Sequence, residues 1–336
     1  RHQRDWRAHP TILTGDIGVH NDRTDNSYHV VRTQNDATLD GLIIEGGYAD
    51  GADSDGWGGG AFLEADSGAT IINCVFRNNY GVLGGGLYSR QAPPTVFQSI
   101  FYANEADSGA AIYVEENNPI LRFCNFYGNQ AATQGGAVTG GAGTRPQLAG
   151  CIVWGNTPDS LVSALSDVQH SIIEGGWSGT NVLDADPLFV DPADGDFTLQ
   201  LDSPAIDAGV DSNLLRDTLD YDGDGDVAEL FSLDFHKGPR RVNLTERANT
   251  GTGVPVDIGA VEFPGYHGFG DRVWLDINRD GLQSVGEPGL EGVRVNMYDV
   301  TGLELLDVTD TDEDGHYQFG QNLNLGTHVI EFVLAT

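Results

Sequence analysis

Apolar and polar positions recur along residues 37–175 in a pattern that repeats about every 25 residues. One phrase returns at steps of 25, 25 and 27 residues, as Cys74-Val-Phe76-Arg-Asn-Asn79, Ser99-Ile-Phe101-Tyr-Ala-Asn104, Cys124-Asn-Phe126-Tyr-Gly-Asn129 and Cys151-Ile-Val153-Trp-Gly-Asn156. A second phrase keeps this step, as Gly59-Gly60-Ala61-Phe62, Gly84-Gly85-Gly86-Leu87, Gly109-Ala110-Ala111-Ile112 and Gln134-Gly135-Gly136-Ala137. Self-similarity at this period predicts a solenoid, whose units bury their apolar faces only by stacking.

The short apolar runs within each repeat are broken by Gly and Asn, which is typical of strands rather than helices. Three short strands and three turns would fill one repeat, with successive coils stacked roughly 4.8 Å apart. We therefore predict a right-handed parallel β-helix of about 25 residues per coil. The Phe column should form an internal ladder, and the Asn column should lie at a turn, where Asn tolerates the left-handed conformation.

The three cysteines, Cys74, Cys124 and Cys151, all fall in one repeat column, together with Ser99. We interpret them as small core residues of the ladder. Cys74 and Cys124 would be two coils apart, too far to bridge, whereas Cys124 and Cys151 would be neighbours whose bonding the sequence leaves open.

The two repeated phrases resemble the polymorphic-outer-membrane-protein type of β-helix repeat over residues 37–175. The repeat then fades, and Asp184-Ala-Asp-Pro-Leu-Phe-Val-Asp-Pro192, Ser203-Pro-Ala-Ile-Asp-Ala-Gly209, Asp234-Phe-His-Lys-Gly-Pro-Arg240 and Val256-Asp-Ile-Gly-Ala-Val-Glu-Phe263 follow. This series resembles the C-terminal segment of secreted, surface-anchored bacterial β-helix proteins. We expect a β-helix over 1–200 and a segment over 201–264 that covers its open end.

A different pattern begins after the linker Pro264-Gly-Tyr-His-Gly268. Alternating apolar residues on short strands predict an immunoglobulin-like β-sandwich over 265–336, so the whole chain is expected to be all-β. Its phrases, including Gly270-Asp-Arg-Val-Trp-Leu-Asp-Ile-Asn-Arg-Asp-Gly281 and Gly286-Glu-Pro-Gly-Leu-Glu-Gly-Val-Arg-Val-Asn-Met-Tyr298, resemble the B-type domain of the serine-aspartate-repeat surface adhesins. The resemblance implies a calcium-binding spacer. We expect either further sequence or a strand added by another subunit to complete this sheet.

Residues 276–287 follow the twelve-residue calcium-loop pattern. Oxygen atoms of Asp276, Asn278 and Asp280, the Leu282 carbonyl and the closing carboxylate of Glu287 are the expected Ca²⁺ ligands. The adhesin resemblance further implies that Asp312 and Asp314 belong to a second such loop. The expected role of Ca²⁺ is structural, because converging carboxylates need a neutralising cation.

A further calcium candidate lies in the segment that follows the repeats. Its acidic residues are Asp220, Asp222, Asp224, Asp226 and Glu229, where Glu229 would replace the missing closing acid at Phe231. A last cluster, made of Asp16, Asn21, Asp22, Asp25 and Asn26, has irregular spacing, and its sequence does not decide between a metal site and a plain turn.

The formal net charge of −33 limits the classes of partner that the chain is expected to bind. Such a surface repels nucleic acid and anionic membranes, so neither nucleic-acid binding nor direct membrane insertion is expected. The chain shows no signal peptide or apolar spanning run, and we expect an exported protein from which the leader is absent. The expected localisation is extracellular or at a bacterial cell surface, with self-association or other surface proteins as partners.

The repeats also offer candidate sugar-binding side chains. Tyr102, Tyr127 and Trp154 each follow a ladder position and should face outward, where they could stack on a polysaccharide or be covered by a loop or another subunit. We find no catalytic constellation and predict a structural or adhesive protein, with filament formation as an extension. The alternative is a carbohydrate-active β-helix enzyme, a lyase or hydrolase, which would need converging carboxylates or a basic residue in one groove.

Overall fold

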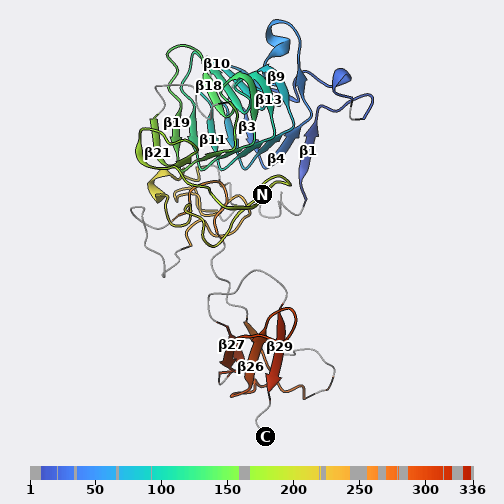
Figure 1. Ribbon diagram of the computed structural model, residues 1–336, viewed down its shortest axis with the longest axis vertical. Coiled ribbons are helices and arrows are strands. Elements are labelled where there is room, and N and C mark those ends of the chain that lie inside the picture. Colours follow the sequence, from blue (N-terminus) through green and yellow to red (C-terminus); the bar gives the residue numbers. More distant parts are fainter. Residues whose placement is uncertain are drawn as a thin grey trace. The chain divides into compact units, whose positions relative to one another are not determined.

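The computed structural model divides the chain into two compact units, residues 1–263 and 264–336. It describes residues 9–20, 22–33, 36–65, 68–91, 93–158, 167–218, 220, 225–242, 256–263, 270–277, 279, 287–312, 314–319 and 328–333. The first unit is a parallel β-helix and the second is a small antiparallel β structure, as predicted (Figure 1). The helices of the described part are short 3-10 turns, and none has the length and hydrophobicity that crossing a bilayer requires.

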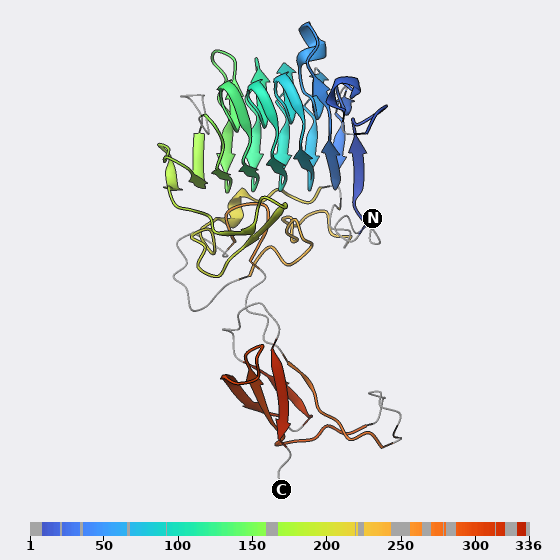
Figure 2. The ribbon, with the colours of Figure 1, turned by 45° about the vertical axis from the view of Figure 1, so that its right-hand side comes forward.

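The largest sheet of the first unit contains two columns of parallel strands, and Figure 2 shows the stacked coils to which they belong. The first column consists of β1 (Thr11–Thr14), β4 (Leu42–Glu45), β8 (Val75–Arg77), β12 (Ile100–Tyr102), β16 (Asn125–Tyr127) and β20 (Ile152–Trp154). The second consists of β3 (Thr38–Asp40), β7 (Thr70–Ile72), β11 (Thr95–Phe97), β15 (Ile120–Arg122) and β19 (Gln147–Ala149). The long strand β21 (Asp167–Ile173) pairs with both β19 and β20 and joins the columns, and β22 (Thr180–Leu183) pairs with β21.

Two smaller parallel sheets complete the coils. One contains β2 (Val31–Thr33), β6 (Ala61–Ala65), β10 (Leu87–Gln91), β14 (Ile112–Glu115) and β18 (Val138–Gly140). The other contains β5 (Tyr48–Ala49), β9 (Tyr80–Leu83), β13 (Glu105–Ser108) and β17 (Gln130–Gln134). The 3-10 turns are η1 (Arg23–Asp25), η2 (Asp53–Gly56) and, after the coils, η3 (Asp211–Asn213).

A complete coil therefore has four strands, for example β7 to β10, where the sequence predicted three. The extra division arises because Asn73, between β7 and β8, has a φ of 54° and bends the chain. Equivalent positions in the next coils, Gln98, Phe123 and Gly150, also have positive φ values of 49°, 51° and 67°. The pattern of hydrophobic residues does not predict this bend. The bend depends on the left-handed backbone conformation of one residue in each coil, and different residue types occupy that position.

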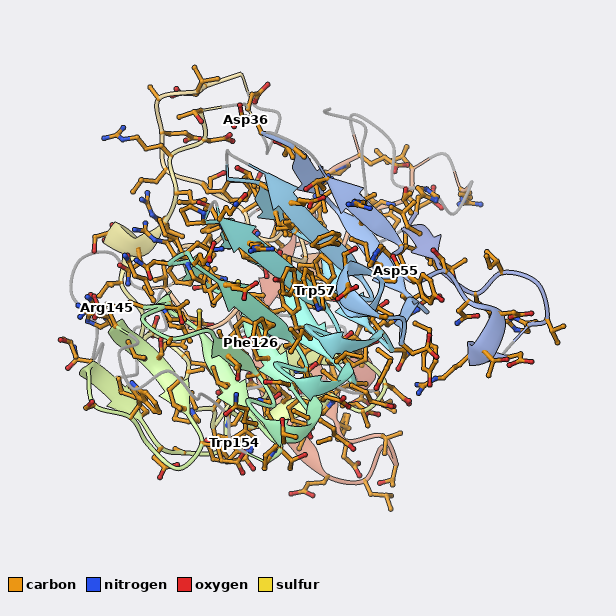
Figure 3. All side chains as sticks on the ribbon, turned by 90° about the horizontal axis from the view of Figure 1, so that it is seen from above. Asp36, Asp55, Trp57, Phe126, Arg145 and Trp154 are labelled. Carbon is orange, nitrogen blue, oxygen red and sulfur yellow. The ribbon has the colours of Figure 1, made fainter. Side chains whose placement is uncertain are left out.

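The predicted apolar ladder is confirmed. Phe76 pairs in register with Phe101, and Phe101 pairs with Phe126, which pairs with Val153. The first two rings stack with centroids 4.6 Å apart, and all four side chains are fully buried. Figure 3 shows Phe126 in the interior of the coils. Cys74, Cys124 and Cys151 line the same core as free thiols, and burial raises the pKa of Cys124, with Cys151 adding to the rise.

The asparagine column forms hydrogen bonds from coil to coil. Asn79 Nδ2 donates to Asn104 Oδ1 at 3.0 Å, Asn104 Nδ2 to Asn129 Oδ1 at 2.9 Å, and Asn129 Nδ2 to Asn156 Oδ1 at 2.8 Å. The left-handed residues, however, are those just before each asparagine, namely Asn78, Ala103, Gly128 and Gly155. The sequence prediction was therefore right about the ladder and wrong about its backbone conformation.

The paired glycines occupy positions where neighbouring coils approach each other closely. Gly84 has a φ of 70°, and a Cβ on Gly85 would lie 2.2 Å from the carbonyl oxygen of Glu105 in the next coil. An L-residue with a side chain would therefore separate the coils at this turn.

The described residues of the segment 184–263, called the side segment below, lie along the side of the coils (Figures 1 and 2). A hairpin of β23 (Phe189–Asp191) and β24 (Asp196–Leu199) starts this side segment. Further along it, Leu214, Phe231 and Val256 pack against Ile72, Phe97 and Phe123, which belong to three successive coils. The sequence predicted a cover for the open end of the solenoid. The side segment instead packs on a lateral face, where it buries apolar side chains of successive coils.

The second unit contains two antiparallel sheets. One pairs β25 (Gly270–Arg272) with β28 (His316–Gln318). In the other, β26 (Arg294–Tyr298) lies between β27 (Leu305–Asp310) and β29 (Val329–Val333). Val295, Met297, Tyr317 and Phe319 form the core between the sheets. The second unit is thus a β-sandwich, as predicted.

Candidate functional site

The two ends of the predicted calcium loop lie together in the second unit. The backbone N–H of Ile277, next to Asp276, donates to Glu287 Oε1 at 3.1 Å. Glu287 is only 7% exposed, and burying a carboxylate to this degree costs free energy unless it is hydrogen-bonded, paired or bound to a metal. Asp276 Oδ1 accepts a hydrogen bond of 2.5 Å from the N–H of Arg279, which has a φ of 64°. Asn278, Asp280 and Leu282 lie outside the described residues.

The second predicted loop is a tight turn beside the first. Asp312 Oδ1 accepts hydrogen bonds from the N–H groups of Asp314 and His316 at 3.0 and 2.8 Å, and both aspartates are exposed. The Arg272 guanidinium joins the two acidic segments, donating to the carbonyl oxygens of Asp314 at 2.8 Å and Glu287 at 3.0 Å. The structure thus brings together residues that the sequence placed in separate loops. Within the described residues, no group of three His, Cys, Asp or Glu side chains is arranged to hold a metal.

The acidic segment of the first unit is only partly described. Asp220 Oδ1 accepts from the N–H of Gly225 at 3.0 Å, and Asp226 Oδ1 accepts from the N–H of Ala228 at 2.8 Å. Glu229 lies on the chain that pairs with Asp217, whose N–H donates to the Glu229 carbonyl at 3.0 Å. Asp222 and Asp224 lie outside the described residues, so the convergence of the predicted ligands stays a prediction.

The irregular cluster near the N-terminus is built as a turn. Asp22 caps the 3-10 turn η1 through the N–H of Thr24, and Asp25 Oδ2 accepts from the N–H of Val19 at 2.8 Å. Asp16 contacts His20 Nδ1 at 2.7 Å. These carboxylates orient their own loop, which is the turn alternative that the sequence left open.

The side segment covers part of the predicted aromatic row. Tyr102 packs edge-on against Phe197 with ring centroids 5.4 Å apart, and Tyr127 packs against Phe189 at 6.0 Å and Phe197 at 5.9 Å. Trp154 is half-buried on the outer side of the coils (Figure 3). A segment of the same chain therefore covers the rings of Tyr102 and Tyr127. Cover by a loop was one of the alternatives that the sequence left open.

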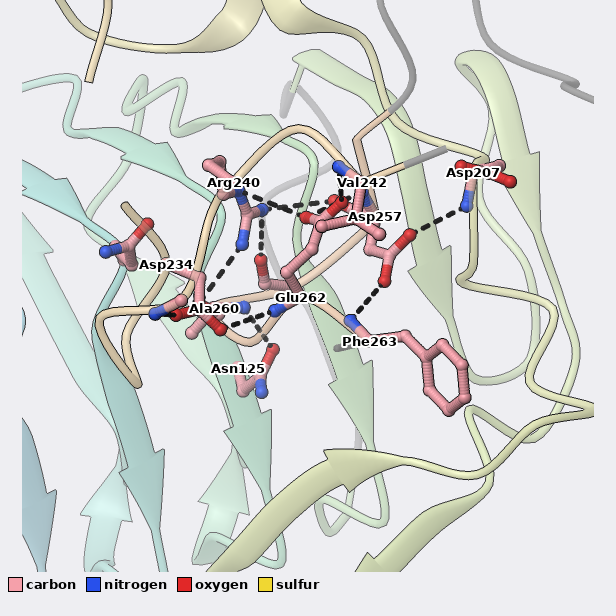
Figure 4. Close-up of polar contacts among 12 residues, drawn as sticks. Asn125, Asp207, Asp234, Arg240, Val242, Asp257, Ala260, Glu262 and Phe263 are labelled. Atoms are coloured by element: carbon pink, nitrogen blue, oxygen red, sulfur yellow. Dashed lines mark hydrogen bonds and ion pairs between the residues drawn. The ribbon is translucent and has the colours of Figure 1, made fainter. Parts of the chain in front are cut away.

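The side segment contains a buried network of charged residues that the sequence analysis did not predict. Arg240 is fully buried, and its Nη atoms donate to the carbonyl oxygens of Asp257, Gly259 and Ala260 at 2.6–3.1 Å (Figure 4). Its Nε lies 3.6 Å from Glu262 Oε2, and the guanidinium lies 4.4 Å from the centre of the Phe123 ring. The polar contacts of Arg240 thus hold the side segment together, and its cation–π contact with Phe123 joins the segment to the coils.

The carboxylates of this network close the loops of the side segment. Asp257 accepts from the N–H groups of Asp207 at 2.8 Å and Phe263 at 2.6 Å, and Asp234 accepts from that of Glu262 at 2.9 Å. Burial raises the pKa of Asp257 to about 7. Burial and the charge of Asp257 raise the pKa of Glu262, and burial also raises that of Asp234. The sequence motifs that contain these residues were recognised, but nothing in them predicted that their charged side chains are buried together.

Comparisons with known proteins agree with this two-part architecture. Residues 267–336 match the SdrD B-like domain. Residues 23–185 match the family model described as a right handed beta helix region. The match to the SdrD B-like domain includes both acidic segments that Arg272 joins, and it confirms the resemblance seen in the sequence. No solved structure matches the chain.

Curated relatives of the chain include several staphylococcal proteins. Serine-aspartate repeat-containing protein I of Staphylococcus saprophyticus is 37% identical over 118 residues, which are 35% of this chain and 6% of that protein. The fibrinogen-binding protein of Staphylococcus epidermidis is 42% identical over 79 residues, 24% of this chain and 7% of that protein. The bone sialoprotein-binding protein of Staphylococcus aureus is 35% identical over 101 residues, 30% of this chain and 9% of that protein. The chain thus spans less than a tenth of the length of these relatives.

Proposed function

We propose that this chain is part of an extracellular, cell-surface protein whose work is adhesive or structural. The observation that carries the proposal is the match of residues 267–336 to the SdrD B-like domain, together with relatives that are named for binding fibrinogen and bone sialoprotein. The β-helix adds a long, regular surface. The interior of the β-helix is filled by a continuous ladder of side chains. Such a solenoid presents an extended face for a partner.

Direct binding tests this role. The full chain should bind saturably to immobilised fibrinogen or bone sialoprotein in surface plasmon resonance, in physiological salt and calcium. An acidic surface of net charge −33 binds basic proteins without specificity, so immobilised lysozyme serves as the control. Binding to lysozyme alone, or binding to the two candidate partners that disappears at 0.5 M salt, would contradict specific adhesion.

Self-association is a second candidate, and one observation favours it. Strands β27 and β29 leave apolar side chains exposed, including Leu305 at 51%, Phe332 at 49% and Val308 at 41%. Exposed apolar groups of this kind on sheet edges are common sites of strand pairing between molecules. Concentration-independent monomeric sedimentation of the full chain in calcium would exclude filament assembly through this sheet.

We also propose that Ca²⁺ stabilises the second unit. The buried carboxylate of Glu287 beside the Asp276 segment fits a hard cation, which takes oxygen ligands and neutralises acids in its shell. Asp276, Asn278, Asp280, Leu282 and Glu287 would hold one ion, and Asp312 and Asp314 would contribute to a second. Asp220, Asp222, Asp224, Asp226 and Glu229 are the corresponding candidates in the first unit.

Calcium should raise the melting temperature of the second unit. An ion present at 100 times its dissociation constant stabilises the state that binds it by about 2.7 kcal/mol. For a unit of this size that corresponds to a rise of about 10–20 °C. Differential scanning calorimetry of the full chain, with calcium and with a chelator, measures the shift.

Glu287→Gln should reduce this shift, while Glu291→Gln, an exposed site four residues further along, should leave it unchanged. Equal shifts in both variants, or no shift in the parent chain, would refute the assignment of calcium to this loop.

A further inference from the structure

Two hollows lie next to each other on the outer face of the first coils. The first has a volume of about 220 Å³ and lies where the side segment turns away from β4, β8 and β12. Its floor is formed by outward-facing apolar residues, Ile43, Val75 and Ile100, which are partners in the β ladder. Arg77, Asp194 and His236 add polar groups to its walls. A small hollow with an apolar floor and a few polar walls is the usual form of a ligand site.

The wall contributed by the side segment is firmly seated. Gly195, in the turn of the β23–β24 hairpin, has a φ of 85°, and a Cβ there would lie 2.8 Å from the Tyr102 hydroxyl. The Tyr102 hydroxyl in turn accepts a hydrogen bond of 3.0 Å from Arg77 Nη1. The hairpin turn therefore lies in close contact with Tyr102, and Tyr102 positions the Arg77 side chain of the wall.

The second hollow has a volume of about 310 Å³ and is lined mostly by polar residues, among them Asp16, His20, Arg23 and Glu45. Asn26 also lines it, and the buried Oδ1 atom of Asn26 has no hydrogen-bond partner among the described residues. That oxygen is buried in the wall and is not the surface that a ligand would meet. The carboxylates and other polar side chains that line the hollow favour a ligand with hydroxyl or amide donors.

The two hollows meet at one ion pair. Arg77 lines the first and Glu45 the second, and these residues are register partners on β8 and β4, with Arg77 Nε 2.6 Å from Glu45 Oε2. A ligand that extends from one hollow to the other would cross this pair. The arrangement suits a chain of at least two similar units rather than one compact molecule.

We propose that these hollows are two neighbouring subsites for a neutral oligosaccharide. A pyranose ring combines an apolar C–H face with hydroxyl groups that both donate and accept hydrogen bonds. A cavity of about 150 Å³ holds benzene, so the first hollow has room for a six-membered ring with substituents. The C–H face would lie on Val75 and Ile100, and the hydroxyl groups would meet Asp194 and Arg77.

Charge decides the class of saccharide. The cations at the hollows already have acidic partners, since Arg77 pairs with Glu45, Arg23 with Glu105 at 3.0 Å and His20 with Asp16. With the net charge of −33, these pairs disfavour uronates and sulfated sugars. A peptide that adds a strand would pair with the edge of β1, which ends its sheet, whereas the first hollow lies over the faces of β4, β8 and β12.

Binding of the full chain to an array of neutral and acidic oligosaccharides tests the proposal, with affinities of the best neutral ligand measured by calorimetry. Val75→Phe should fill the first hollow and abolish binding, whereas Ile120→Phe, the same kind of enlargement on the outer face of β15, should leave it unchanged. Asp194→Asn should weaken binding by about tenfold or more, as expected for a lost hydrogen bond to a charged group.

The second subsite has its own test. His20→Ala should weaken binding of a trisaccharide and leave that of a monosaccharide unchanged. Binding of acidic saccharides or peptides alone, no saturable saccharide binding, or equal affinities of Val75→Phe and the parent chain would each overturn the proposal. These outcomes are separate from protein adhesion, because the proposal does not depend on fibrinogen or bone sialoprotein binding.

Discussion

Replacing Arg240 by methionine should lower the free energy of unfolding of the first unit by about 3–5 kcal/mol, the usual cost of removing one partner of a buried ion pair. Methionine keeps much of the apolar stem but leaves the buried carboxylate of Glu262 and three backbone carbonyl oxygens without their cation. The contact with the Phe123 ring is lost as well. Urea unfolding of the full chain, followed by far-UV circular dichroism, measures the change.

Arg241→Met is the matched control. This neighbouring side chain is 38% exposed and lies 3.8 Å from Asp211, so its loss should cost less than about 1 kcal/mol. If both variants unfold at the same urea concentration, the buried network does not hold the side segment. If only the side segment unfolds, limited proteolysis should cleave the chain after residue 200 while the coils stay folded.

Asn104→Ala should destabilise the first unit by about 2–4 kcal/mol, because the amide is fully buried and cannot be replaced by water. Its Oδ1 accepts from the N–H and the Nδ2 of Asn79 at 3.2 and 3.0 Å, and its Nδ2 donates to the Phe76 carbonyl and to Asn129 at 2.9 Å. Alanine removes these four hydrogen bonds, although Asn129 Oδ1 keeps the backbone N–H of residue 104 and Asn79 Nδ2 keeps the Ile44 carbonyl. Thermal and urea unfolding of the full chain would show the loss.

Asn78→Gly tests whether this effect belongs to the ladder. Asn78 is exposed and has a φ of 54°, which glycine adopts freely, so the change should stay within about 0.5 kcal/mol. A destabilisation by Asn104→Ala no larger than that of Asn78→Gly would mean that the ladder contributes little to stability.

The sequence predicted the solenoid well because its signal is repeated. Phe76, Phe101 and Phe126 each occupy the same place in a unit, so one reading of the period fixes the register of every coil. The same holds for the asparagines. The match of the second unit to the SdrD B-like domain was also visible in its phrases, since turn residues and alternating apolar residues stand close together in the chain.

What the sequence did not predict depends on contacts between distant residues. Arg240 meets Phe123 across more than 100 residues, and no local pattern marks a charged residue that will be buried. The same is true of Phe197 over Tyr102 and of the division of each coil by a left-handed residue such as Asn73. For the calcium loops the spacing alone made the prediction, and the structure adds the link between Glu287 and Asp314 through Arg272.

The direction of the asparagine ladder has a consequence for the solenoid as a whole. Between the side chains, every amide from Asn79 to Asn129 donates to the asparagine of the following coil, and its remaining donor bonds a backbone carbonyl of the preceding coil. Aligned amide dipoles add and polarise one another, so the column has a negative and a positive end. The two ends of the stack are thus electrically different, and a charged group approaching along its axis would favour one end over the other.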